Sequence, residues 1–563
     1  MSTGRVAPRT ARLPDYGDDD AYVAGRVAYG ADPAWRWTPP ERVDAPAPAT
    51  ALLPPRVRDD EEEDEDEDGA GEREAGATAS AASQTALRGL FGRDSAYLLV
   101  AASQSALAAI SIPITTRLLG RQFAVVTTSI AVMQVLVAFG VFSLPFAIQR
   151  NYRDEDGGRD ARRTISLAII TAAITLVIAY ATGPLWSPAL GLGSFGPPLH
   201  YAVIWAALAA VTFAAIAMLR SRNLFRAYAL VSVVQSLIAE VVAVLLVVFV
   251  HRSAAEFILG EMLVQLLAAA IALFATRPLP LRRRDGALIA SSLKYAGGLL
   301  PASVAGFLLT SSDRIIIRHD LPALIQVARY GAVYNIASIP ILLLGLLDPV
   351  WLPRFFRLND PELRARLLAD SRDVLFRLLI PTVLGLGLGI PLLLSVWVPG
   401  DYHPAGLVIV VVTISVGAFP VAGYISANRV LLIAGRTFPI GMTTVVVAMF
   451  NIAANIVLVP RMGIEGAALS TSLAYVLQLV LGTFFAYRIQ SLRRPPLGLL
   501  AGSAVAIAGA LSFTLLPWTG AFAVGRAVLT LACVVAAVTV LRDVITDRSP
   551  RRIPGTRRRS EQR

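Results

Sequence analysis

The chain has 563 residues, of which 55% are hydrophobic, and its mean hydropathy is +0.60. This composition is too apolar for several soluble domains and indicates an integral membrane protein. A formal net charge of +11 suggests nucleic-acid binding in a soluble protein. Here most arginines cluster in short loops between apolar runs, where they report membrane topology. We therefore expect membrane lipids around the chain and no nucleic-acid partner.

Three residue types exclude further classes. Cys533 is the only cysteine and lies in an apolar run, so neither a disulfide framework nor a cysteine-based metal site is expected. Lys294 is the only lysine, and no glycine-rich phosphate loop precedes it. The four histidines do not cluster in sequence. The sequence predicts no ATPase motor of the phosphate-loop kind, no metal site and no cofactor.

The first 90 residues differ in composition from the rest. They are rich in proline and contain an unbroken acidic run, Asp59–Asp68. A block of like charges repels itself and cannot bury a hydrophobic core. We predict a disordered, acidic, cytoplasmic tail.

Fourteen apolar runs follow, each of a length that crosses a bilayer as a helix. They lie near Ser95–Ile114, Ala124–Ile148, Ile165–Leu185, Tyr201–Leu219, Tyr228–Val250, Ala255–Ala275, Leu288–Ile317, Ala328–Leu352, Leu375–Val398, Ala405–Ile425, Ile440–Val459, Gly466–Ala486, Leu499–Leu516 and Phe522–Leu541. The prediction is an all-α, polytopic integral membrane protein with about fourteen transmembrane helices.

Basic residues indicate the orientation in the membrane. Clusters of arginine follow every even-numbered run, whereas the alternate loops Gly183–Leu199 and Pro399–Pro404 contain neither lysine nor arginine. Since positive residues stay on the cytoplasmic side, both termini are predicted to be cytoplasmic, in the plasma membrane.

Two connectors depart from this charge rule. ITTRLLGRQF follows the first run and holds Arg117 and Arg121, and TSSDRIIIRHD follows the seventh and holds Arg314 and Arg318. Both connectors are predicted to face outside, and the i, i+4 spacing puts each pair on one helix face. The arginines either line a shared cavity or extend toward phosphates of the outer leaflet.

The two exceptions occupy equivalent positions if the first twelve runs form two halves of six. An even number of spans per half makes the halves parallel repeats, related by an axis along the membrane normal. The predicted parts are a disordered acidic tail (1–90), an N-terminal six-helix bundle (91–280), a C-terminal six-helix bundle (285–490), two extra transmembrane helices (495–545) and a basic cytoplasmic tail (546–563).

The eleventh and twelfth runs contain small residues at their junction. Asn451 and Asn455 lie one helical turn apart, and Gly463 and Gly466 allow close helix contact. This pattern indicates a tight helical hairpin with a packing role.

The hairpin also resembles a known family. It reads NIAANIVLVPRMGIEGAALST, which is similar to the penultimate hairpin of the polysaccharide flippases (O-antigen and exopolysaccharide flippases of the Wzx type) in the multidrug/oligosaccharidyl-lipid/polysaccharide exporter superfamily. The stretches RLLGRQFAVVTTSI and DRIIIRHD…YGAVYNIASIP resemble the first hairpins of each half in that family. The resemblance runs from about Ser95 to Arg488. Related drug exporters typically have aspartate where this chain has Asn455.

The resemblance implies a transporter that moves a polyprenyl-diphosphate-linked oligosaccharide to the outer leaflet by alternating access. A polysaccharide polymerase or glycosyltransferases are expected as neighbours. A lipid II flippase and a small-molecule or drug exporter of the same superfamily stay open as alternatives. A membrane polysaccharide polymerase or ligase is less favoured, because the longest outer connector, Gly183–Leu199, holds no cluster of acids, bases or nucleophiles. We expect no enzymatic activity.

A flippase for such a lipid must carry a diphosphate through an apolar core. Guanidinium groups stay protonated and pair with phosphate oxygens in a bidentate fashion. The candidate substrate-binding residues are Arg117, Arg121, Arg314, Arg318 and Lys294.

Three carboxylates in the apolar runs are candidates for ion coupling. Asp313 either neutralises Arg314 or takes up a coupling proton or sodium ion. For Glu240 and Glu261, a structural pairing competes with the same coupling role.

Overall fold

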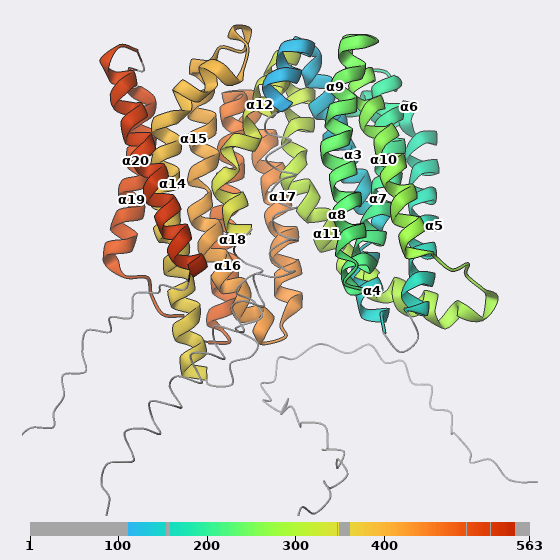
Figure 1. The fold of residues 1–563 in the computed structure, drawn as a ribbon. Helices are drawn as coiled ribbons and strands as arrows, with labels where there is room; N and C mark the ends of the chain where they lie inside the picture. Colours follow the sequence, from blue (N-terminus) through green and yellow to red (C-terminus); the bar gives the residue numbers. More distant parts are fainter. Residues whose placement is uncertain are drawn as a thin grey trace, which may run out of the picture. The chain divides into compact units, whose positions relative to one another are not determined.

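The computed structural model describes residues 111–153, 158–321, 323–345, 347, 361–490, 492–517 and 519–546 (Figure 1). These residues form helices joined by short connectors, and the described part of the chain contains no β-strand. An apolar run in a bilayer satisfies its backbone polar groups within one helix, since lipid offers no partners. The predicted all-α class is confirmed.

The N-terminal half has α7 at its centre. The half begins with helical residues 111–119 and continues with η1 (Gly120–Gln122), α3 (Phe123–Val141), α4 (Leu144–Asn151), α5 (Arg159–Ala181), α6 (Gly183–Ala189), α7 (Pro197–Ser221), α8 (Phe225–Val233), η2 (Val234–Ile238), α9 (Ala239–Phe249) and α10 (Ala254–Thr276). Helix α7 packs against α3, α5 and α10. Buried alanines such as Ala202, Ala210 and Ala214 allow these close contacts.

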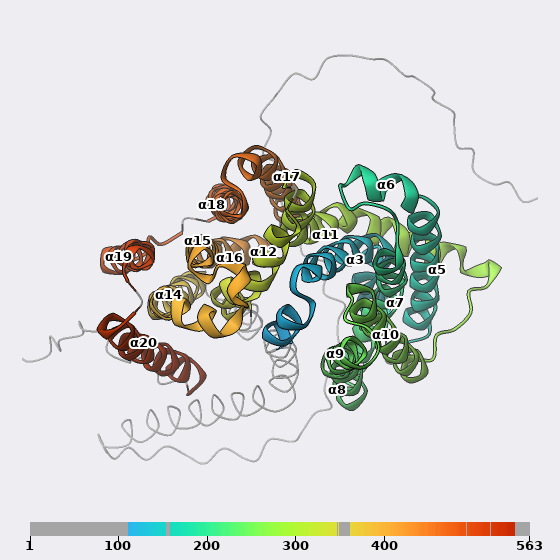
Figure 2. The ribbon, with the colours of Figure 1, turned by 90° about the horizontal axis from the view of Figure 1, so that it is seen from above.

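The C-terminal half begins with the long helix α11. It consists of η3 (Arg283–Asp285), α11 (Gly286–Asp320), α12 (Leu324–Ala337), α14 (Pro361–Trp397), η4 (Gly400–Tyr402), η5 (Pro404–Leu407), α15 (Val408–Val416), α16 (Ala418–Ile433), α17 (Thr437–Met462), α18 (Ile464–Tyr487), α19 (Leu497–Ser512), η6 (Phe513–Leu515) and α20 (Ala521–Thr546). Helices α19 and α20 both pack against α14 and lie at one side of this half when it is seen from above (Figure 2).

Twelve helices among the described residues have the length and apolarity of a membrane span. Leu324–Ala337 and Ile339–Gly345 meet at an angle of 44°, and they make a thirteenth span if the bent pair is counted as one. These thirteen correspond to the second to fourteenth predicted runs. The first run lies outside the described residues apart from positions 111–114, so the count of fourteen stays a prediction. The predicted tails, 1–90 and 546–563, lie outside them except for residue 546.

The second predicted span is broken in the structure. The run Ala124–Ile148 was expected to form one helix, but α3 ends at Val141 and α4 begins at Leu144. Phe142 and Ser143 have φ values of 48° and 53°, which interrupt the right-handed helix. Apolarity alone gives no sign of this break.

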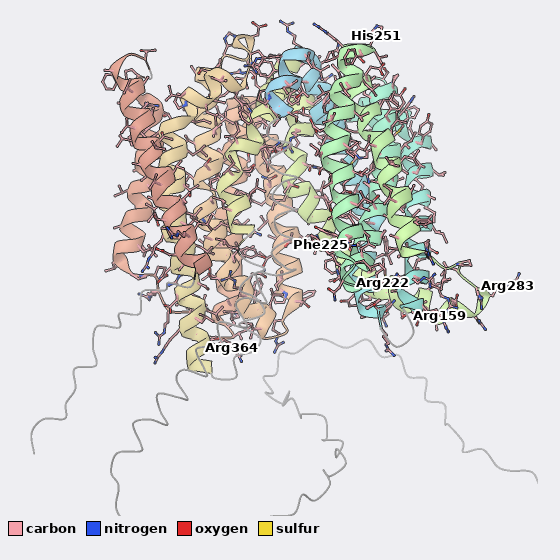
Figure 3. The ribbon with its side chains drawn as sticks, in the orientation of Figure 1. Arg159, Arg222, Phe225, His251, Arg283 and Arg364 are labelled. Carbon is pink, nitrogen blue, oxygen red and sulfur yellow. The ribbon has the colours of Figure 1, made fainter. Side chains whose placement is uncertain are left out.

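The arginine-rich loops lie together at one end of the helices. Arg159, Arg222, Arg283 and Arg364 are all found at that end, whereas His251 lies at the other (Figure 3). We call these the arginine-rich end and the opposite end. The arginine-rich end is the one predicted to face the cytoplasm.

The two halves pack together through α3 on one side and α11 and α12 on the other. The largest buried apolar cluster contains residues of both halves, including Phe123 and Phe257 from the first and Val333 and Val411 from the second. The hydrophobic core is therefore continuous across the junction.

Candidate functional site

The pair Asp313 and Arg314 lies near the C-terminal end of α11. The Asp313 side chain is buried at 1% exposure. Its Oδ2 accepts a hydrogen bond of 2.6 Å from the phenol of Tyr330, and its Oδ1 accepts one of 2.8 Å from the backbone N–H of Arg314. Nη1 of Arg314 is 3.7 Å from the same Oδ1. The buried carboxylate is thus paired and hydrogen-bonded, as a charge in an apolar core requires.

The guanidinium of Arg314 is held by more than this aspartate. Nη1 donates to the backbone oxygen of Thr310 at 2.8 Å, and the guanidinium carbon lies 4.2 Å from the ring centroid of Tyr334. Its side chain is only 12% exposed. Tyr475 on α18 lies next to Tyr334. The cluster therefore connects α11, α12 and α18 around one fixed positive charge.

The other basic candidates on α11 lie at different depths. Arg318 is half-buried, one turn beyond Arg314. Lys294 is exposed and lies 20 residues before Arg314, which is about 30 Å along a helix. Near it, the guanidinium of Arg150 lies 4.3 Å from the ring centroid of Tyr295. Lys294 belongs to the arginine-rich end and not to the Asp313 cluster.

Arg117 and Arg121 line a cavity of about 500 Å³ at the opposite end. Arg329, Asp401 and His403 also line it. Among the described residues, neither Arg314 nor Arg318 of α11 lines this cavity. In this conformation the structure brings Arg117 and Arg121 together with Arg329, and a cavity shared by both pairs stays a prediction.

Arg117 makes contacts that join the two halves. Nη1 donates to the carbonyl of Pro113 at 2.7 Å and to that of Trp397 at 3.4 Å, and Nη2 donates to the carbonyl of Val396. The last two carbonyls belong to the C-terminal end of α14, where a cation is favourable because helix carbonyls are unpaired there.

Tyr402 provides a second contact between the halves at this end. Its phenol donates to the backbone oxygen of Gly120 at 2.8 Å. Burial raises the pKa of the Tyr402 phenol above its usual value, so the group stays a donor. The opposite end is thus closed by contacts between η1 and the connector that follows α14.

Glu240 and Glu261 come together although they belong to different predicted runs. Glu240 lies on α9 and Glu261 on α10, with their carboxyl groups within hydrogen-bonding reach of each other. Ser111 lies close to Glu240, and Glu261 is 7% exposed. Gly260 permits this helix contact, since a Cβ there would meet Ala243 Cα at 2.5 Å. The structure therefore brings these two coupling candidates from separate runs side by side.

The residues of the expected hairpin lie at the contact between α17 and α18. Asn451 and Asn455 are fully buried, and Nδ2 of Asn455 donates to the backbone oxygen of Asn451 at 2.9 Å. The turn is at Gly463, with φ of 64°, and a Cβ on Gly466 would meet the Leu458 carbonyl oxygen at 2.5 Å. These glycines allow the two helices to touch.

Several residues of the site were not among the sequence candidates, among them Arg329, Tyr330, Tyr334 and Tyr402. Arg329 stands at the start of the eighth apolar run, beside the predicted outer surface, and this position could have identified it as a candidate. Nothing in the sequence identifies Tyr330, because a tyrosine in an apolar run is common. Within the described residues, no group of three or more His, Cys, Asp or Glu side chains is placed to hold a metal ion.

Helices that span a membrane, two halves packed around α3 and α11, and charges buried between helices define a polytopic membrane transporter fold. Solved structures share it. The chain is similar to a lipid II flippase MurJ in an inward closed conformation, with a TM-score of 0.63 and 13% identity over 80% of this chain and 98% of that one. It is also similar to an inward-facing multidrug resistance MATE family transporter of the MOP superfamily, with a TM-score of 0.55 and 12% identity over 71% and 95%.

A comparison of sequence finds a family match. Residues 91–359 match the polysaccharide biosynthesis protein family. The resemblance to flippases noted in the sequence is confirmed. No curated protein sequence matches the chain.

Proposed function

We propose that this chain moves a polyprenyl-diphosphate-linked oligosaccharide from the cytoplasmic to the outer leaflet of the plasma membrane, for cell-surface polysaccharide synthesis. The observation that carries the proposal is the family match, since it covers Arg117, Arg121, Arg314 and Arg318. The relatives in this family and fold are transporters and flippases, and transport is the function that a bundle of spans with buried charges serves best.

The chemistry of Arg314 suits an anionic head group. Its guanidinium is fixed against Tyr334 and Asp313, so little side-chain freedom is lost when an anion binds. A diphosphate that approaches would compete with Asp313 for Nη1, and Tyr330 would keep the released carboxylate hydrogen-bonded. Arg117 and Arg121 would meet the head group at the opposite end, where the contacts of Arg117 to α14 open first.

The coupling ion is part of the proposal. The closeness of Glu240 and Glu261 favours a proton as the coupling ion. A proton shared by two carboxyl groups can be released when α9 and α10 separate. Asp313 is the second candidate, for a proton or a sodium ion, and it is bound more firmly by Tyr330 and Arg314.

The test is transport of a defined lipid by the purified chain in vesicles. A polyprenyl-diphosphate-linked oligosaccharide is placed in one leaflet, and its arrival in the other is followed by an enzyme that acts on exposed sugars. Accumulation of lipid-linked precursor in a strain that lacks a polysaccharide flippase, and its relief by this chain, gives the cellular readout. Vesicles in which the lipid does not cross faster than in protein-free controls would refute the proposal.

A lipid II flippase is the second candidate, favoured by the similarity to MurJ. Both lipids carry a polyprenyl diphosphate, so the same arginines would serve either. The same vesicle assay with lipid II as the substrate separates them: we expect the oligosaccharide-linked lipid to cross faster, and the reverse order would assign the chain to lipid II.

A further inference from the structure

A groove of about 730 Å³ lies between α14, α16, α18 and α19. It is separate from the cluster at Asp313 and from the contacts between the halves, which involve α3, α11 and α12. Helix α19 packs mainly on α14 and α15, and α18 packs on α16 and α17. The space between α18 and α19 is therefore left without a helix to fill it. An unfilled space of this size loses dispersion contacts along its walls.

The walls of the groove are apolar. Phe376 on α14, Phe419 on α16, Leu479 and Phe484 on α18 and Ile507 on α19 line it. The rings of Phe376 and Phe419 form its floor, with centroids 6.0 Å apart. Such a lining accepts hydrocarbon and rejects a polar ligand.

The mouth of the groove is basic and lies at the arginine-rich end. Arg493 and Arg494, in the loop between α18 and α19, line the mouth and are exposed. Buried Arg372 positions this loop, because its Nη1 donates to the backbone oxygen of Arg493. The charge of Arg372 is offset by Asp373, whose Oδ1 accepts from Nη2 at 2.7 Å. Pro495 and Pro496 restrict the loop further. The two exposed guanidiniums are thus held over an apolar slot.

The depth of the groove fits one leaflet. Its lining residues on α14 run from Ala365 to Phe376, about 16 Å along the helix, and those on α18 from Leu479 to Tyr487, about 12 Å. Half of the hydrocarbon thickness of a bilayer is about 15 Å. An acyl chain from one leaflet matches this depth, whereas a long polyprenyl chain exceeds it.

We infer that this groove binds an anionic phospholipid of the leaflet at the arginine-rich end, with an acyl chain between α18 and α19 and the phosphate at Arg493 and Arg494. Arginine pairs with phosphate oxygens in a planar, charge-assisted contact. An anionic headgroup has no ammonium cation to compensate its phosphate, so it brings a net negative charge to these guanidiniums. Binding of a phospholipid in this groove does not require a transported substrate. The inference is therefore independent of the proposed transport function.

Native mass spectrometry of the purified full-length chain in detergent tests this inference. The protein is titrated with a phosphatidylglycerol and with a phosphatidylcholine that carries identical acyl chains. We expect tighter binding of phosphatidylglycerol, and R493Q/R494Q should weaken it about tenfold, as the loss of one or two charge-assisted contacts predicts. Ala504→Trp, at an exposed position of α19 that lines the groove, should weaken both lipids by filling the slot.

The matched control is R283Q/R284Q, which removes two exposed arginines from η3 at the same end and should leave binding unchanged. Equal binding of the two lipids by the wild-type chain would overturn the inference. So would wild-type affinity for phosphatidylglycerol in both R493Q/R494Q and Ala504→Trp. Displacement of phosphatidylglycerol by an equal concentration of undecaprenyl diphosphate would also overturn it, and would assign the groove to the carrier lipid.

Discussion

The phenol of Tyr330 donates a hydrogen bond of 2.6 Å to the carboxylate of Asp313, and both side chains are buried. The two residues lie on α12 and α11, which follow each other in the chain. The contact therefore joins these helices at the depth where Arg314 is held. A carboxylate here without this donor would keep an unsatisfied oxygen in an apolar core.

Tyr330→Phe should lower the stability of the purified protein. The substitution removes the donor and leaves the ring, so the loss is that of one buried polar contact, about 1–2 kcal/mol in a membrane protein. Thermal unfolding in detergent measures it. Tyr180→Phe is the control, because Tyr180 is exposed and contacts other residues through its ring. Equal unfolding temperatures for both variants would contradict a stabilising role for the phenol.

Arg314→Ala should abolish transport of the lipid-linked oligosaccharide while the protein is still made and inserted. The substitution removes the one fixed charge that Tyr334 and Asp313 hold in the bundle. Arg314→Lys should transport slowly, since an ammonium keeps the charge but lacks the planar fork that pairs with two phosphate oxygens. The vesicle assay described above gives both rates.

Arg222→Ala is the control for this comparison, because Arg222 is an exposed residue of the arginine-rich end. We expect it to transport at the wild-type rate. Normal transport by Arg314→Ala would show that Arg314 serves only to neutralise Asp313, which is the alternative that the sequence left open.

The elements that could be predicted are those that depend on apolarity along the chain. Twelve spans, or thirteen with the bent pair counted as one, match predicted runs because a bilayer imposes length and hydropathy on each helix separately. The contacts across helices could not be predicted in the same way. A span that is apolar on all sides shows no face in its sequence, so neither the pair of Tyr330 with Asp313 nor that of Glu240 with Glu261 could be read from one sequence. Arg117 could be predicted as a candidate because it departs from the positive-inside rule. The carbonyl groups that it contacts, 279 and 280 residues away in the chain, could not be predicted.

Arg117→Ala should open the opposite end. The guanidinium binds carbonyls at the C-terminal end of α14, and its removal leaves the hydrogen bond of Tyr402 to Gly120 as the nearby link between η1 and this connector. Spin labels at His251→Cys and Ala405→Cys, both exposed and in a Cys533→Ser background, report the separation of the halves at this end. We expect the distance distribution to shift to longer values in the variant.

Arg121→Ala is the control for this measurement, since Arg121 lines the same cavity and is exposed. It should leave the distances unchanged and reduce transport. The reverse pattern, with longer distances in Arg121→Ala alone, would show that the contacts of Arg117 do not hold the halves together.

Glu261→Gln should remove the response of transport to a proton gradient. Buried Glu261 on α10 faces the half-buried Glu240 on α9, and under the proposed coupling an amide at position 261 cannot take up or release a proton. Glutamine keeps the size and hydrogen-bonding capacity of the side chain, so the contact between α9 and α10 is preserved.

Transport in vesicles with an imposed pH difference is compared with transport in vesicles without one. The wild-type chain should respond and the variant should run at its basal rate under both conditions. A sodium gradient at constant pH is the second arm: acceleration of the wild-type chain by sodium, and not by protons, would transfer the coupling role from this pair to Asp313.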